Sequence, residues 1–123
     1  MLFRKKKQDT IAKGGWLKIE YSEQNTLVQL SGNLNQTLNK ELRESLEALI
    51  KQRADKKIII NLSQIYFIDT TIAATLARVA KQAQKRKAQL LMVDASPPVQ
   101  RVFASLGLED LLSLSPQRGD ATS

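Results

Sequence analysis

Asp69, Thr70 and Thr71 are the side chains in this sequence best placed to support chemistry, because they stand directly before a helical pattern of apolar residues. Asp69 is a good N-terminal cap for a helix that begins at about Thr70. A hydroxyl at that position lies where unpaired N–H groups and the helix dipole favour negative charge. An aspartate and a threonine before a helix are also ordinary capping residues, so their types alone leave a purely structural role open.

The rest of the sequence offers little for catalysis. It has no histidine and no cysteine, which excludes thiol nucleophiles, Cys/His metal sites and Ser-His-Asp triads. Glu41, Glu44 and Glu47 alternate with lysines and arginines on one predicted helix face, as solvated helix-stabilising pairs do. No phosphate-binding loop or dinucleotide-binding glycine pattern occurs. We therefore expect a protein that is not an enzyme and has neither a cofactor nor a metal site.

Composition indicates one ordinary globular domain. The 123 residues are 42% apolar and 25% charged. No apolar run approaches the ~20 residues of a membrane span, and the basic start lacks the apolar stretch of a secretory signal. We therefore expect a cytoplasmic protein.

The net charge of +7 is concentrated in two places. Four of the 19 basic residues lie in the first seven positions, and a second group comprises Lys81, Lys85, Arg86 and Lys87. The six aromatic residues are not interleaved with these charges as they are in single-strand-binding proteins. No nucleic-acid partner is expected, and a basic nucleic-acid-binding protein is a remote alternative.

Hydrophobic periodicity predicts the element order β-β-α-β-α-β-α. The strands are expected at 16–21, 26–31, 57–62 and 89–93, and the helices at about 36–53, 70–84 and 97–106. Crossovers of this length give parallel neighbours, so we expect a mixed sheet with helices packed largely on one side. The run Ile58–Ile60 lacks alternation, which predicts a strand covered on both faces. Residues 1–14 are expected to be a disordered basic arm, 15–115 the domain and 116–123 a disordered tail.

Three segments, at residues 31–35, 60–71 and 97–108, together resemble the signature of the STAS family, the anti-sigma-factor-antagonist fold. Ile60–Thr71 resembles the family's strand and loop D-L-S-x-V-x-x-[IM]-D-[ST]-[ST]-G-L. Ser31–Asn35 is similar to its G-[ED]-L-D turn, and Pro97–Leu108 resembles its closing helix P-x-V-x-R-[VL]-[FL]-x-x-x-G-L. The resemblance implies an α/β domain with a mixed four- to five-stranded sheet and three to four helices.

The resemblance also implies a function, that of an anti-sigma factor antagonist. Such a protein is a bacterial regulatory switch that docks on an anti-sigma factor or a serine/threonine-kinase-type regulator, with a phosphatase as a further partner. The family's phosphate acceptor is the first hydroxyl after the loop aspartate, here Thr70, with Thr71 as the second and less exposed candidate. The implied partner-binding residues are Asn33, Asn35, Asp69, Thr70, Thr71 and Ile72.

This sequence departs from the family pattern at three of those positions. Ile72 stands where the family has glycine, and a β-branched residue narrows the approach of a partner's backbone. Asn33 and Asn35 replace two acidic residues by neutral amides. These departures leave open whether Thr70 is a kinase substrate.

An alternative within the same fold is a cytoplasmic STAS accessory subunit of a lipid or anion transporter, with a transporter ATPase subunit as its partner. In that case the arm containing Arg4–Lys7 offers a weak contact with an anionic membrane surface. A merely solubilising arm is the simpler interpretation.

Overall fold

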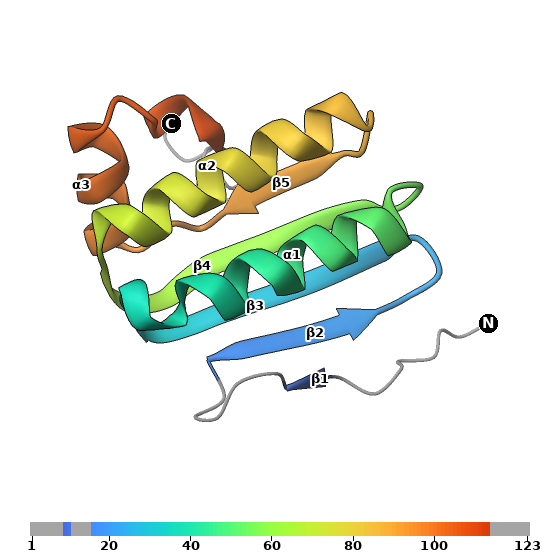
Figure 1. Ribbon diagram of the computed structural model, residues 1–123, viewed down its shortest axis with the longest axis horizontal. Coiled ribbons are helices and arrows are strands. Elements are labelled where there is room, and N and C mark those ends of the chain that lie inside the picture. Colours follow the sequence, from blue (N-terminus) through green and yellow to red (C-terminus); the bar gives the residue numbers. More distant parts are fainter. Residues whose placement is uncertain (1–8, 11–15, 114–123) are drawn as a thin grey trace, which may run out of the picture.

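The structure is a computed structural model, and it describes residues 9–10 and 16–113. Figure 1 shows the elements along the chain. In order they are β1 (Asp9–Thr10), β2 (Leu17–Tyr21), β3 (Asn25–Leu34), the 3-10 turn η1 (Gln36–Leu38), α1 (Asn39–Arg53), β4 (Lys57–Ile68), α2 (Thr70–Lys85), β5 (Leu90–Val93), α3 (Pro97–Ser105), the 3-10 turn η2 (Glu109–Leu111) and β6 (Leu112–Ser113).

The strands form one mixed sheet in the order β1-β2-β3-β4-β5-β6. β1 and β2, and β2 and β3, pair antiparallel, whereas the remaining neighbours are parallel. The predicted mixed α/β sheet and element order are confirmed. Two-residue strands extend both edges, so the sheet has six strands where four to five were expected. β1 falls within the segment predicted to be a disordered arm, where Asp9 and Thr10 pair with Ile19 and Lys18 of β2. The rest of the predicted arm and the predicted tail from residue 116 lie outside the described residues, so both stay predictions.

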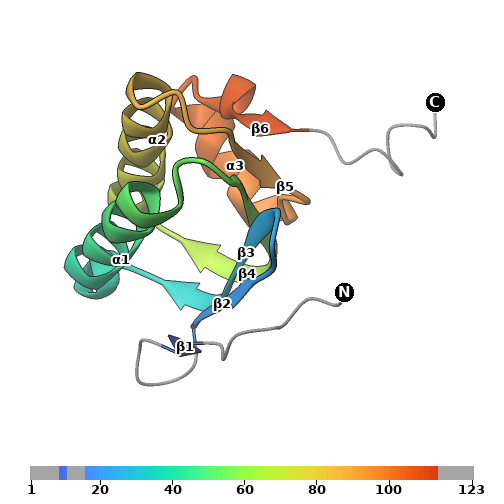
Figure 2. The same ribbon diagram turned by 90° about the vertical axis from the view of Figure 1, so that its right-hand side faces the viewer.

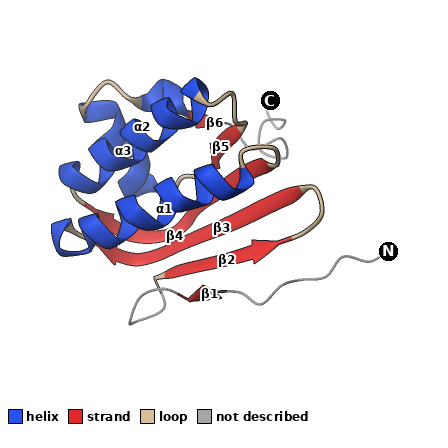
Figure 3. Ribbon diagram, turned by 45° about the vertical axis from the view of Figure 1, so that its right-hand side comes forward, coloured by secondary structure: helices blue, strands red, loops and turns tan. Residues whose placement is uncertain are grey.

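The three α-helices cover one face of the sheet, as predicted (Figures 2 and 3). Side chains alternate accordingly along β2 and β3: Leu17, Val28 and Leu30 are buried under the helices, whereas Lys18 and Leu27 are exposed on the opposite face. None of the helices in the described residues is long and apolar enough to cross a membrane.

The prediction that Ile58–Ile60 is covered on both faces is wrong. Ile58 and Ile60 are fully buried, but Ile59 between them is only half-buried and lies on the open face. Its register partners there are Leu27 on β3 and Leu91 on β5. Leu27, Ile59 and Leu91 therefore form a row of apolar side chains across the uncovered face of the sheet. Because Ile59 is apolar on that face, the run Ile58–Ile60 shows no alternation of apolar and polar residues.

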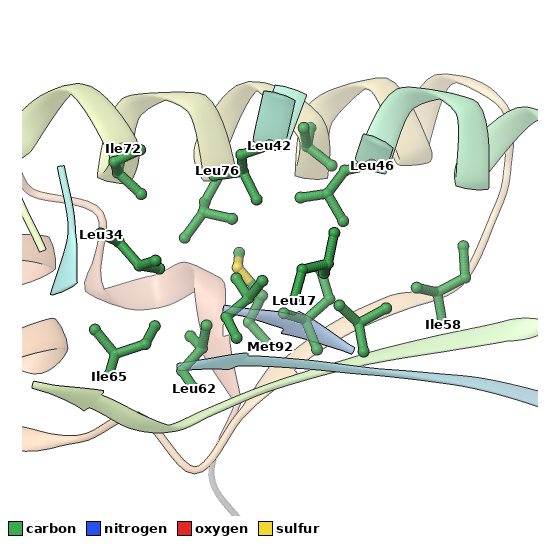
Figure 4. Close-up of a cluster of buried hydrophobic side chains, with 14 of the residues drawn as sticks. Leu17, Leu34, Leu42, Leu46, Ile58, Leu62, Ile65, Ile72, Leu76 and Met92 are labelled. Carbon is green, nitrogen blue, oxygen red and sulfur yellow. The ribbon is translucent and has the colours of Figure 1, made fainter. Parts of the chain in front are cut away.

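The core lies between the helices and the covered face of the sheet (Figure 4). The largest fully buried side chains come from β2, β3, α1, β4, α2 and α3: Leu17, Leu30, Leu34, Leu42, Leu46, Ile58, Ile60, Leu62, Ile65, Ile72, Leu76 and Phe103. The buried residues of α1 and α2 recur with a helical period, and those of β4 alternate from Ile58 to Leu62 before continuing at Ile65 and Ile68.

The register between β3 and β4 shifts at two places shortly before Asp69 and Thr70. Between Gln29 and Ser31, and again between Gly32 and Asn33, β4 uses one residue more than β3. Such bulges bend a strand and re-aim its side chains. Gly32 has a φ of 90°, a conformation that suits glycine. β4 then ends at Ile68, and the chain turns through Asp69 directly into α2.

Candidate functional site

Asp69 holds together the N-terminal ends of two helical segments. Its Oδ1 accepts a hydrogen bond from the backbone N–H of Ile72 at 3.0 Å, and this contact caps α2 as predicted. Its Oδ2 accepts from the backbone N–H of Gln36 at 2.7 Å, in the turn η1 that leads into α1. The N–H of Asp69 itself donates to the carbonyl of Leu34 at 3.2 Å. The loop is therefore fixed by three bonds from one residue, two of which reach β3 and η1.

The turn before α1 is closed by the two asparagines that replace the family's acidic residues. The Oδ1 of Asn35 accepts from the backbone N–H and the hydroxyl of Thr37, at 3.0 and 2.6 Å. Its Nδ2 donates to the Oδ1 of Asn33 at 2.9 Å. Two carboxylates in this arrangement would repel each other, because neither carries a donor. The amide pair is therefore a self-bonded unit in which Asn35 caps η1.

Thr70 and Thr71 are both exposed at the first turn of α2. A helix turns by roughly 100° per residue, so these two threonines and Ala74 share the outer face, whereas Ile72, Ala73 and Leu76 face the core. The expectation that Thr71 is the less exposed of the two stays a prediction, because both threonines are exposed in this structure. Both hydroxyls are accessible to another protein.

Ile72 does not belong to the accessible surface. Its side chain is fully buried, and Figure 4 shows it among core residues with Leu34 and Leu76. The prediction that Ile72 contacts a partner is wrong for its side chain, because the helix phase turns that side chain inward. Ile72 instead fills the core beneath the loop that carries Thr70.

A side-chain bond on the inner side of the site joins the two helices. The hydroxyl of Thr75, which is 7% exposed, is hydrogen-bonded to the Oδ1 of Asn39 in the first turn of α1. Together with Asp69, this contact keeps the two helix N-termini adjacent. The positive ends of both helix dipoles therefore point toward the same end of the molecule, which favours negative charge there.

Sequence reasoning missed the aromatic pair that precedes the loop. Tyr66 is 70% exposed and Phe67 is 44% exposed, and Phe67 is the register partner of Asn33. The only signal in the sequence is that two large aromatic residues follow each other directly, which breaks the alternation of a strand with one covered face. Asn39 and Thr75 were also missed, because their contact joins two helices whose relative position no local pattern encodes.

The predicted site residues thus separate into two groups. Asn33, Thr70 and Thr71 are all exposed, near the end of β3 and at the start of α2, two segments joined by the bond from the Asp69 N–H to the Leu34 carbonyl. Asp69 and Asn35 are mainly structural, because their oxygens are already used in capping. The arrangement presents hydroxyl, amide and aromatic side chains, which suits the binding of another protein.

The chain belongs to the STAS domain family, whose profile matches residues 17–121. Among individual proteins, it is 21% identical over 98 residues to an anti-sigma F factor antagonist of Paenibacillus polymyxa, with 80% of this chain and 84% of that protein covered.

Solved structures share its fold. An anti-sigma factor antagonist from Mycobacterium paratuberculosis superposes with a TM-score of 0.70 at 21% identity, covering 85% of this chain and 88% of that one. The Bacillus cell fate determinant SpoIIAA in its phosphorylated form gives a TM-score of 0.64 at 18% identity, covering 87% of this chain and 99% of that one.

Proposed function

We propose that this protein is a regulatory protein-binding switch, an anti-sigma factor antagonist that docks on an anti-sigma factor or kinase-type regulator and acts by binding, not by catalysis. One observation carries the proposal. Thr70, the residue that matches the family's phosphate acceptor, is exposed as the first residue of α2, directly after Asp69, which braces this end of the helix. The antagonist relatives of this STAS domain support the same assignment.

The docking surface comprises Asn33, Tyr66, Phe67, Thr70 and Thr71. Exposed aromatic residues are enriched in protein interfaces and often dominate their binding energy. Tyr66 and Phe67 supply that apolar component directly before the loop. Thr70 and Thr71 supply small polar groups that a partner can approach closely. This combination is suited to a specific contact that one added charge can break.

Phosphorylation of Thr70 is the proposed means of control. A phosphate adds roughly −1.5 to −2 charges at neutral pH. The residues that follow Asp69 in the first turn of α2 are uncharged, and the helix dipole stabilises an anion there. The modified protein should therefore keep its fold, so the added charge acts on the partner contact. A phosphatase that removes the group would restore docking.

Chemical-shift mapping on the isotope-labelled full chain tests the placement of the surface. We expect the host's kinase-type anti-sigma factor to perturb the amides of residues 33–35 and 66–75 first. Tyr66→Ala should weaken binding about tenfold or more, as truncation of an interface anchor does. Leu27→Ala is the matched control, because Leu27 is another exposed apolar side chain, 45% exposed, on the part of β3 remote from the loop.

Two results would count against the proposal in different ways. Shift changes confined to residues 40–51 would show that the docking surface is misplaced. A stoichiometric complex with a transporter ATPase subunit, and not with an anti-sigma factor, would preserve the surface but assign the chain to the transporter alternative.

A further inference from the structure

A cleft of about 440 Å³ lies between the C-terminal ends of α1 and α2. Figure 1 shows these ends at the side of the molecule opposite the loop between β4 and α2. Six residues line this space, hereafter the basic cleft: Glu47, Ile50, Lys51, Gln82, Lys85 and Arg86. The basic cleft is therefore separate from the docking surface, and its volume is in the range of small-molecule sites, roughly 300–1,000 Å³.

Three exposed cationic side chains line the basic cleft, and none of them is in an ion pair with a carboxylate of the described residues. The ion pairs within the described residues are Lys40–Glu44 and Lys56–Asp55, and neither includes Lys51, Lys85 or Arg86. One lysine at the end of each helix is ordinary, because it complements the helix dipole. Three cations facing one space repel one another, with Glu47 as the only carboxylate of the lining. An anion bound between them would relieve that repulsion.

Gln82 adds an unused hydrogen-bonding group to the same lining. Its Oε1 is buried and has no hydrogen-bond partner among the described residues. A buried acceptor without a donor is unfavourable by about 1–3 kcal/mol. A ligand that carries a hydroxyl beside its anionic group would satisfy it. Ile50, which is 2% exposed, contributes an apolar residue to the lining of the cleft but little accessible surface.

We propose that the basic cleft binds a hydroxyl-bearing phosphate ester. Its phosphate oxygens would accept hydrogen bonds from Lys51, Lys85 and Arg86, the last of which offers the planar fork that suits phosphate. Its hydroxyl would donate to the Oε1 of Gln82 once the amide rotates toward the cleft, because this oxygen is buried in the structure. The same chemistry is present in a soluble polyol phosphate and in the phosphoglycerol headgroup of an anionic lipid. The protein would then bind a phosphate ester at the basic cleft in addition to binding a partner protein at the docking surface.

The test uses the full chain and two probes, sn-glycerol 3-phosphate in solution and vesicles of phosphatidylglycerol compared with phosphatidylcholine. Binding is followed by calorimetry, by chemical shifts at residues 82–86 and by vesicle co-sedimentation. We expect saturable binding of at least one probe. The double variant Lys85→Ala/Arg86→Ala should lower its affinity about tenfold or more, because two charge-assisted contacts are lost.

The control is the double variant Arg78→Ala/Lys81→Ala. It removes the same charge from the same helix at two exposed positions outside the cleft lining. Its affinity for the probe should fall by less than about threefold, because salt screens charges that do not touch the ligand. Gln82→Leu should reduce the preference for glycerol phosphate over inorganic phosphate while leaving inorganic phosphate binding unchanged.

The possible results distinguish the two sources of the ligand, and they also show when the proposal fails. Binding of glycerol phosphate in solution assigns a soluble ester, and binding of phosphatidylglycerol vesicles alone assigns the lipid headgroup. The proposal is overturned if neither probe binds, or if the two double variants lose affinity equally. Partner docking by Lys85→Ala/Arg86→Ala should equal that of the wild type, so a failure here leaves the proposed function untouched.

Discussion

The carboxylate of Asp69 and the backbone N–H of Gln36, thirty-three residues earlier in the chain, are joined by a 2.7 Å hydrogen bond. The same carboxylate caps α2 through Ile72. One side chain therefore fixes the loop that carries Thr70 and the turn that leads into α1. Asp69 therefore braces the helix start that carries the proposed docking surface, and loss of binding on its substitution would first indicate a loss of structure.

Replacing Asp69 by alanine should lower the free energy of unfolding by about 2 kcal/mol, because it removes a helix cap and a second charge-assisted bond. Asp69→Asn keeps one acceptor oxygen and should lose about half as much. Urea denaturation measures both. Thr70→Ala is the control, with an expected loss of about 1 kcal/mol or less since the cap remains. Equal losses for Asp69→Ala and Thr70→Ala would contradict the stabilising role given to the two bonds of Asp69.

The sequence was sufficient to predict Asp69 as a cap, because capping is a local property of an aspartate before an apolar helix. It could not predict the bond to Gln36, which depends on how β3 and β4 pair. Ile72 shows a different limit. Its spacing with Leu76 and Val79 predicts the buried face of α2, yet the family pattern suggested a partner contact at that position. Here the helical period was the better guide.

Ile72 should behave as a core residue. Ile72→Val should lower the free energy of unfolding by about 1 kcal/mol, and Ile72→Ala by about 2–4 kcal/mol, because a fully buried side chain is removed. Ile72→Gly, which restores the family's residue, should lose about 1 kcal/mol more. The matched control Ala74→Gly, at an exposed position of the same helix, should lose only about 1 kcal/mol. A fully stable Ile72→Gly protein would contradict the packing described for α2.

Arg53 organises the opposite end of the sheet, a role that no local pattern in the sequence revealed. Its Nε donates to the buried hydroxyl of Thr26 at 2.8 Å, one Nη donates to the carbonyl of Ser22 at 2.8 Å, and its guanidinium lies 5.0 Å from the ring centroid of Tyr21. Arg53→Lys should lower the free energy of unfolding by about 1–2 kcal/mol, because an ammonium cannot make both bonds and stack as well. Arg43→Lys on the same helix should change it by less than about 0.5 kcal/mol. Equal effects at the two positions, measured by thermal unfolding, would refute this role.

The fold was predictable where apolar residues recur with the period of a helix or a strand. It was less predictable where bulges interrupt the pairing of β3 and β4. The strands and helices follow from periodicity, and parallel crossovers follow from their order. The bulges that expose Tyr66 do not, because a bulge is set by the pairing of two strands and leaves a weak trace in either one alone. The apolar run around Ile59 likewise has the sequence pattern of a strand buried on both faces, although one face of the sheet is open in the structure.

The affinity of the host's kinase-type anti-sigma factor for Thr70→Glu, compared with Thr70→Gln, tests the central claim most directly. The two variants have nearly the same size and differ in charge, and both should keep the wild-type melting temperature because α2 tolerates either residue at its exposed first turn. Thr70→Gln should bind within about tenfold of the wild type, whereas Thr70→Glu should bind about a hundredfold more weakly, as a like or unpaired charge in an interface does. Equal affinities for the two variants would contradict the account of Thr70 as the control point.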